Sequence, residues 1–237
     1  MISTFSWIGA QHAQNCEENQ DAVCHAAGES LNVISLADGV SSCKEAKLGA
    51  EVASKAVTEL FLKKGPFFLE FDETRTAEYA LAHVLAELKR QAEMFSGSLE
   101  DYSSTLASVL VDKKKKKMLC FSLGDSVILS TQGGKCRVIS TPSDSLSGCC
   151  VTTTKHAERM IFVRTYEDIS SLESVVICSD GAWREMFSKG RLKPEVARML
   201  SDGGYDALGS FLIGRHCSDD SSFISLTIQS KKGGECA

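Results

Sequence analysis

The order of the hydrophobic patterns restricts the fold of this chain more than any other feature. Apolar residues recur at helical spacing in two consecutive segments, residues 48–61 and 81–95. Strand-like apolar runs precede and follow this pair of helices, whereas a regular alternation of strands and helices is typical of parallel βαβ sheets. The segregated order therefore predicts an α+β fold, in which two packed antiparallel β-sheets are flanked by helices.

The remaining segments complete this expectation. Strands are expected at residues 4–11, 21–27, 31–37, 106–111, 118–123, 127–131, 136–140, 159–164, 174–178 and 222–228, and short helices at 182–188, 193–200 and 206–215. The basic residues and Gly65-Pro66 should end the first long helix. The lysine run 113–117 separates two strands and is expected to be a solvated hairpin tip.

Residues 140–158 are polar and aperiodic, so the longest loop is expected there. We expect one domain, residues 1–230, and a polar tail, residues 231–237.

Composition argues against several classes of protein. The net charge of −5 gives no overall attraction to nucleic acid or to an anionic membrane. No apolar stretch approaches the roughly 20 residues of a membrane-spanning helix, and the N-terminus lacks the pattern of a signal peptide. The ten cysteines are scattered and form no CxxC motif, so we expect them to be reduced and mostly buried. The sequence thus predicts a monomeric cytoplasmic protein that binds neither nucleic acid nor a membrane.

Aspartates stand at the ends of several strand-like runs. Asp21 opens one run, Asp38 closes another and is followed by Gly39, Asp180 precedes Gly181, and Asp219 lies just before the last strand. Glycine after such an aspartate lets the backbone approach an ion closely. Several carboxylates gathered at one end of a sheet would form a site for a hard cation such as Mg²⁺ or Mn²⁺. The pattern therefore predicts metal-assisted chemistry on phosphate.

Any one of these motifs is weak evidence of function by itself, but together their order and spacing resemble those of one protein family. The motifs are Asn19-Gln20-Asp21-Ala22, Leu36-Ala37-Asp38-Gly39-Val40, Ser103-Ser104-Thr105-Leu106, Ser122-Leu123-Gly124-Asp125-Ser126, Cys178-Ser179-Asp180-Gly181 and Asp219-Asp220-Ser221-Ser222. This series resembles the metal-dependent Ser/Thr protein phosphatases of type 2C over residues 6–228. The segment from Gly9 to His12 is similar to the compact bacterial branch.

The resemblance implies a fold and a set of ligands. The fold would be a four-layer α-β-β-α sandwich with two Mn²⁺ or Mg²⁺ ions between the sheets. Asp38 would bridge both ions, and the Gly39 carbonyl and Asp21 would bind one of them. Asp180 and Asp219 would hold the other ion, with Asp220 secondary to Asp219. Residues 103–105 and Gly124 would be structural.

The implied function is hydrolysis of phosphoserine or phosphothreonine in proteins, by attack of a water that bridges the two metals. The substrate would be a protein phosphorylated by a Ser/Thr kinase. No activated protein nucleophile is required, so no side chain is assigned to covalent catalysis.

Three positions depart from the family pattern. His12 stands where many members carry an arginine that grips phosphate, so His12 is a candidate phosphate contact. Val40 replaces a histidine that some members have after Asp-Gly. Many members bind a further metal through the aspartate that matches Asp125 and a second acid, where this chain has Arg184. Arg184 either places its guanidinium near Asp125 or points to solvent.

Two other functions stay open at this stage. The chain could be a catalytically silent relative that binds a phosphoprotein or regulator, although all four core metal positions keep aspartate. It could also be a metal phosphoesterase or nuclease acting on small molecules or nucleic acid, although no basic cleft pattern with interleaved aromatic residues supports this.

Overall fold

Two five-stranded antiparallel sheets form the centre of the molecule in a computed structural model that describes residues 1–140 and 150–229. The first sheet has the order β1 (Ile2–Trp7), β12 (Ser221–Thr227), β9 (Ser174–Cys178), β6 (Val127–Gln132) and β7 (Lys135–Ser140). The second has the order β2 (Asp21–Ala27), β3 (Leu31–Asp38), β4 (Leu106–Asp112), β5 (Lys117–Leu123) and β8 (Phe162–Tyr166). A small separate hairpin pairs β10 (Phe187–Ser188) with β11 (Arg191–Leu192).

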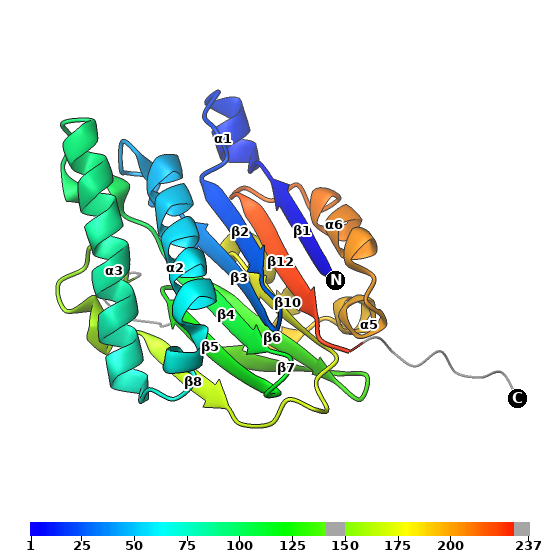
Figure 1. Cartoon of the computed structure of the whole chain (residues 1–237). Helices are drawn as coiled ribbons and strands as arrows, with labels where there is room; N and C mark the ends of the chain where they lie inside the picture. Colours follow the sequence, from blue (N-terminus) through cyan, green and yellow to red (C-terminus); the bar gives the residue numbers. More distant parts are fainter. Residues whose placement is uncertain (141–149, 230–237) are drawn as a thin grey trace, which may run out of the picture.

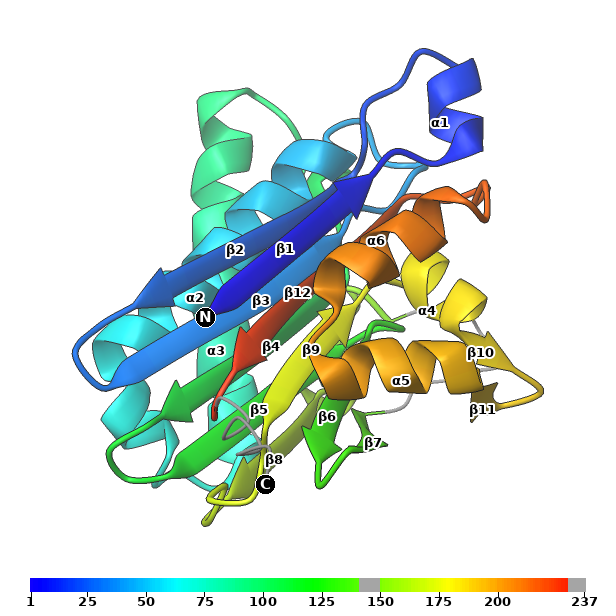
Figure 2. The same ribbon diagram turned by 90° about the vertical axis from the view of Figure 1, so that its right-hand side faces the viewer.

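Helices cover the outer face of each sheet (Figure 1). Helices α2 (Ala46–Phe68) and α3 (Glu73–Met94) lie on the second sheet, and η1 (Leu99–Tyr102), a 3₁₀ turn, leads from α3 to β4. The first sheet is covered by α4 (Asp180–Met186), α5 (Pro194–Asp202) and α6 (Tyr205–Ile213), as Figure 2 shows from the other side. The expected four-layer α-β-β-α sandwich is therefore confirmed.

The four layers of helices and sheets are held together by three layers of apolar side chains that lie between them. Phe61, Leu88 and Phe121 belong to the layer between the long helices and the second sheet. The layer between the sheets contains fully buried aliphatic side chains from both, among them Ile34 and Ile177. The inner strands β3, β4, β5, β6, β9 and β12 are covered on both faces, so nearly all of their residues are buried, whereas the edge strands are partly exposed. The strand ends, where these buried runs stop, are left for polar residues.

The first strand is shorter than expected. The sequence predicts a strand over residues 4–11, but β1 ends at Trp7, and Ala10–Gln14 forms a short helix, α1. The reason is tertiary, because the N–H groups of Ala10 and Gln11 donate to the carbonyls of Cys217 and Ser218. Gly9 packs so closely on the backbone of residues 218 and 219 that a Cβ would not fit there. This docking turns the chain out of the sheet and places α1 beyond the ends of β1 and β2 (Figure 2).

Other boundaries also differ from the sequence-based expectation. Helix α2 continues through Gly65-Pro66 to Phe68, with a kink at Lys64, where the backbone angles are non-helical. Pro66 therefore lies in the first turn after the kink, where a proline interrupts no helical hydrogen bond. Residues 157–159 form a 3₁₀ turn, η2, and the following strand begins only at Phe162.

Several smaller expectations are met. The lysine run forms an exposed tip between β4 and β5, where the Asp112 carboxylate accepts from the N–H groups of Lys114 and Lys115. All eight cysteines in residues 1–140 and 150–229 are free, but only Cys120, Cys150, Cys178 and Cys217 are buried, so the expectation that most of them are buried is not met. No helix in these ranges is long and apolar enough to cross a membrane. The predicted tail, residues 231–237, lies outside the described residues, as does the middle of the predicted 140–158 loop.

Candidate functional site

The β2–β3 hairpin sets two of the predicted aspartates opposite each other. Asp21 is the first residue of β2, Asp38 is the last residue of β3, and the antiparallel register pairs them directly. Like charges at directly paired positions repel, because the two side chains project from the same face. Asp21 is only 2% exposed, and both of its carboxylate oxygens are buried without a hydrogen-bond partner. Such a carboxylate is unfavourable unless a cation compensates it.

The first sheet contributes two more aspartates from the adjacent ends of β9 and β12. Asp180 follows β9 and begins α4, whereas Asp219 lies just before β12. Gly181 permits the two segments to touch, because a Cβ at this position would collide with the Asp220 carbonyl and lie 3.2 Å from the Asp219 Cβ. The Oδ1 atom of Asp180 is buried and has no hydrogen-bond partner.

The carboxylates of both sheets form one electrostatic cluster. Burial is the main cause that raises the pKa of Asp38 well above its usual value, and the charges of Asp21, Asp180, Asp219 and Asp125 raise it further. Burial raises the pKa of Asp21 to about 7, and the charges of Asp220 and Asp180 act in the same direction. Burial and then the charge of Asp125 raise the pKa of Asp180 to about 6. The structure thus brings together the five aspartates that the sequence singled out.

The donor atoms of this cluster fit a hard cation. Asp21 and Asp180 present unpaired buried carboxylate oxygens, and oxygen donors of this kind are the ligands that Mg²⁺ and Mn²⁺ prefer. In residues 1–140 and 150–229, no group of three His, Cys, Asp or Glu side chains is arranged to hold an ion as it stands. Metal binding would therefore draw these side chains closer together, with the strand register setting their starting positions.

Residues 103–105 hold the end of β3, as expected. The Thr105 hydroxyl accepts from the Asp38 N–H at 3.1 Å, and the Thr105 N–H donates to the Asp38 carbonyl at 2.8 Å. The Ser103 hydroxyl donates to the Glu100 carbonyl and so caps the preceding 3₁₀ turn. Gly124, with a φ of +102°, leaves room for Thr105, because a Cβ there would lie 2.7 Å from the Thr105 side chain. The backbone of Asp38 is therefore held by two hydrogen bonds to Thr105.

Asp220 binds three groups that come from the N-terminal region. Its Oδ1 accepts from the Gly9 N–H at 2.7 Å, and its Oδ2 accepts from the Gln20 N–H at 2.6 Å and from His12 Nδ1 at 2.9 Å. His12 is 6% exposed, and its Nε2 lies 3.5 Å from the Ser41 hydroxyl. Because both Asp220 oxygens are occupied, the geometry is consistent with the expected secondary role of Asp220. His12 can reach a ligand only through Nε2.

Arg184 does not pair with Asp125. Its guanidinium lies on Asp180, with 2.8 Å between Arg184 Nη2 and Asp180 Oδ2, and its side chain is 56% exposed. The link to Asp125 comes instead from Trp183, whose indole N–H donates to the Asp125 carbonyl at 2.8 Å. Neither arrangement expected from the sequence is therefore correct: the guanidinium pairs with a carboxylate, but with a different one. The reason is helix geometry, since Asp180 and Arg184 are one turn apart on α4.

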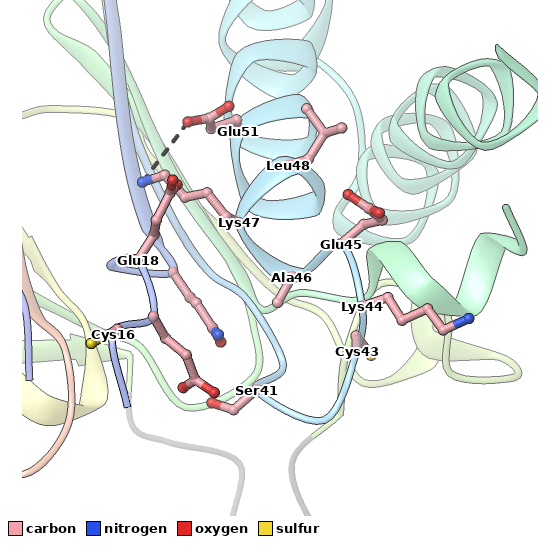
Figure 3. A pocket seen from close by; sticks show the side chains of 12 residues that line it. Cys16, Glu18, Ser41, Cys43, Lys44, Glu45, Ala46, Lys47, Leu48 and Glu51 are labelled. Carbon is pink, nitrogen blue, oxygen red and sulfur yellow. Dashed lines mark ion pairs between the residues drawn. The ribbon is translucent and has the colours of Figure 1, made fainter. Parts of the chain in front are cut away.

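A cavity of about 610 Å³ is lined by Gln20, the residue before Asp21, and by the start of α2, but by none of the five aspartates. Figure 3 shows its walls. The first turn of α2 forms one wall, and the loop that carries Cys16 and Glu18 forms the other. Lys47 in this wall donates to the Asp21 carbonyl at 2.9 Å and lies 3.8 Å from Glu51. The cavity therefore adjoins the backbone of Asp21 through Gln20 and Lys47.

Sequence reasoning missed two of these features. Lys47 reads as an ordinary surface lysine of a helix, and nothing local shows that it reaches β2. The anchoring by Asp220 was also not foreseen, because its partners are about 200 residues away in sequence. The repeated Asp219-Asp220 pair was the only available signal, since two adjacent side chains leaving a turn usually point in different directions.

Comparisons with known proteins agree with this fold. A family model described as protein phosphatase 2C matches residues 8–208. The serine/threonine phosphatase Stp1 from Staphylococcus aureus is 14% identical, covers 97% of this chain and 95% of its own, and has a TM-score of 0.64. The S. agalactiae serine/threonine phosphatase is 15% identical, with 97% and 99% covered and a TM-score of 0.68. RsbX in complex with magnesium is 14% identical, with 94% and 92% covered and a TM-score of 0.58. Among curated proteins, none matches this chain in sequence.

Proposed function

The chain belongs to the protein phosphatase 2C family, and from this premise we propose that it is a Mn²⁺- or Mg²⁺-dependent phosphatase of phosphoserine and phosphothreonine in proteins. The observation that carries the proposal is the cluster of carboxylates around Asp38, which come from both sheets and include buried oxygens without partners. Buried carboxylates at this density are unfavourable without a compensating cation, so a functional ion is the simplest reason for their presence.

In this proposal Asp21, Asp38, the Gly39 carbonyl, Asp180 and Asp219 would hold two divalent cations, and Asp125 is a candidate for a further one. Bound there, the cations would supply activated water at neutral pH and neutralise charge on the phosphate. The protein itself supplies orientation: Thr105 holds Asp38, and Lys47 holds the Asp21 backbone. His12 would face a phosphate oxygen with Nε2 and could donate to it only as the doubly protonated imidazolium, because Nδ1 already donates to Asp220. Val40 offers no proton to the leaving group, so that proton would come from water.

The proposed substrate is a phosphorylated protein, and the cavity that adjoins the Asp21 backbone would take the residues that flank the phosphate. The proposal keeps the remaining expectations from the sequence, namely a cytoplasmic monomer without nucleic-acid or membrane partners.

A catalytically silent, phosphoprotein-binding relative is the second candidate. The ion pair of Arg184 with Asp180 favours it, because a guanidinium already neutralises one of the proposed ligands. Hydrolysis of small phosphate esters is a third candidate, since the cavity is open to them as well.

Turnover measurements separate these candidates. We expect Mn²⁺-dependent hydrolysis of both p-nitrophenyl phosphate and a phosphothreonine peptide, which Asp38→Asn reduces to background. Thermal unfolding in EDTA should show that Asp38→Asn stays folded and is no less stable, because it removes a repelled carboxylate. Asp206→Asn, an exposed aspartate on α6, is the matched control and should keep full activity.

Other outcomes would support one of the alternative functions or contradict the metal assignment. Turnover of the small ester alone would support a small-molecule phosphoesterase. Binding of the phosphopeptide without turnover would support the silent relative. Full activity of Asp38→Asn would contradict the metal assignment.

A further inference from the structure

The ion pair between Arg184 and Asp180 divides the two oxygens of one carboxylate between different environments. Asp180 Oδ2 accepts from Arg184 at 2.8 Å on the solvent side. Asp180 Oδ1 faces inward, is buried and has no hydrogen-bond partner. The carboxylate as a whole is nearly buried, at 7% exposure. One oxygen is thus engaged by a cation that belongs to the chain, and only the other is free for an ion.

The guanidinium is held in place from a second direction. It lies 5.9 Å from the centre of the Trp183 ring, within the range of a cation–π contact. The Trp183 indole is fixed in turn by its hydrogen bond to the Asp125 carbonyl. In addition, the i, i+4 spacing on α4 makes the pair local, so no other element has to move for it to form or break. Arg184 is therefore placed next to Asp180 by two contacts, the ion pair itself and the Trp183 ring.

A fixed positive charge beside a carboxylate opposes the binding of a dication to the same carboxylate. The guanidinium competes for Oδ2, and it also repels the incoming ion when only Oδ1 is used. Asp21 and Asp38 have no such ion pair in the described residues, so the opposition acts on the Asp180 side of the cluster.

We propose that Arg184 is a positioning residue that acts through Asp180, restricts it to one available oxygen and selectively weakens the metal that Asp180 binds. This inference rests on the proposed function, because it concerns a metal that the carboxylates would hold. Its consequence is a built-in difference in affinity: the ion near Asp21 and Asp38 binds first, and the ion at Asp180 binds more weakly and exchanges more readily.

Metal binding without substrate tests this inference. Free Mn²⁺ is measured by electron paramagnetic resonance during titration of the whole chain and of Arg184→Gln. We expect two classes of site in the unmutated protein and a weaker class that becomes tighter in Arg184→Gln. A half-exposed ion pair contributes up to about 1 kcal/mol, so the expected change in Kd is at most roughly fivefold.

Two further variants separate charge from general effects. Arg184→Lys retains a cation and should leave the weaker class close to its original affinity. Arg191→Gln removes the same charge from the exposed β10–β11 hairpin and should not change it. Thermal unfolding in EDTA checks that each variant is folded, as the exposure of Arg184 leads us to expect.

The outcomes distinguish a failure of the proposed role of Arg184 from a failure of the proposed metal-dependent function. Equal or weaker binding by Arg184→Gln would overturn the role of Arg184 and leave the proposed function intact. The same change in Arg191→Gln would also overturn it, because overall charge would then be the cause. If neither the unmutated protein nor Arg184→Gln binds Mn²⁺, both this inference and the proposed metal-dependent function are wrong.

Discussion

Asp219 and Asp220 are neighbours in sequence with different surroundings. Asp219 contributes its charge to the cluster around Asp38. Asp220, at 2% exposure, accepts hydrogen bonds from Gly9, His12 and Gln20. Gln20 directly precedes Asp21, so Asp220 also fixes the backbone from which a proposed metal ligand projects. The same residue type therefore serves as a candidate ligand at one position and as a structural anchor at the next.

Substitution should separate these two roles. Asp220→Asn replaces one acceptor oxygen with an NH₂ group that faces other donors, so we expect it to destabilise the fold by about 1–3 kcal/mol. Mn²⁺ binding by the folded variant should largely persist. Asp219→Asn should do the reverse, with weaker Mn²⁺ binding and unchanged or higher stability in EDTA. Denaturant unfolding and Mn²⁺ titration measure the two effects, and equal loss of metal in both variants would show that Asp220 is itself a ligand.

At the scale of elements, the position of α2 decides where the cavity and the β3 end lie. Gly49 on α2 packs directly on the backbone of Tyr102, the last residue of η1. Residues 103–105 follow immediately and hold Asp38. The helix therefore supports the site from outside through one close backbone contact, which only a residue without a side chain permits.

Gly49→Ala should consequently displace α2. A Cβ at this position would collide with the Tyr102 carbonyl, and overpacking of this kind costs about 1–3 kcal/mol. We expect a lower midpoint of unfolding and reduced turnover by the folded fraction. Gly214→Ala is the matched control, because it ends α6 at a φ of −67° and its nearest new contact would be 3.5 Å away. A stability of Gly49→Ala equal to that of the control would contradict this packing.

At the scale of the whole molecule, the two sheets meet at the group of carboxylates around Asp38, of which only Asp180 has an ion-pair partner among the described residues, Arg184. The pKa of Asp21 is raised from 3.8 to about 7 and that of Asp180 to about 6, chiefly by burial in both cases. A folded state that raises the pKa of an acid binds its proton more tightly than the unfolded chain does. Stability from these groups is thus greatest below pH 4 and is lost as the pH rises toward 7.

The metal-free protein should therefore unfold at a higher temperature at pH 5.5 than at pH 7.5. Thermal unfolding in EDTA measures this, and Asp21→Asn should flatten the dependence because it removes one of the titrating groups. Saturating Mn²⁺ should reverse the trend, since metal binds the deprotonated carboxylates. Greater stability at pH 7.5 in EDTA would show that the carboxylates are not destabilising in the metal-free fold.

The sequence by itself determined the layers of this protein and the aspartates of its site. Hydrophobic periodicity is local, so it identifies α2, α3 and most of the strands without reference to tertiary contacts. The aspartates of interest stand where apolar runs stop, and sheet formation necessarily brings such positions to the sheet ends.

Only the tertiary structure decided which partner each polar side chain has. The bend of the chain at Gly9, the anchoring by Asp220 and the pairing of Arg184 with Asp180 depend on distances between segments that no local pattern encodes. Hydrogen bonds and ion pairs act over a few ångströms, so a small displacement of one element exchanges one partner for another, whereas burial of an apolar face tolerates it.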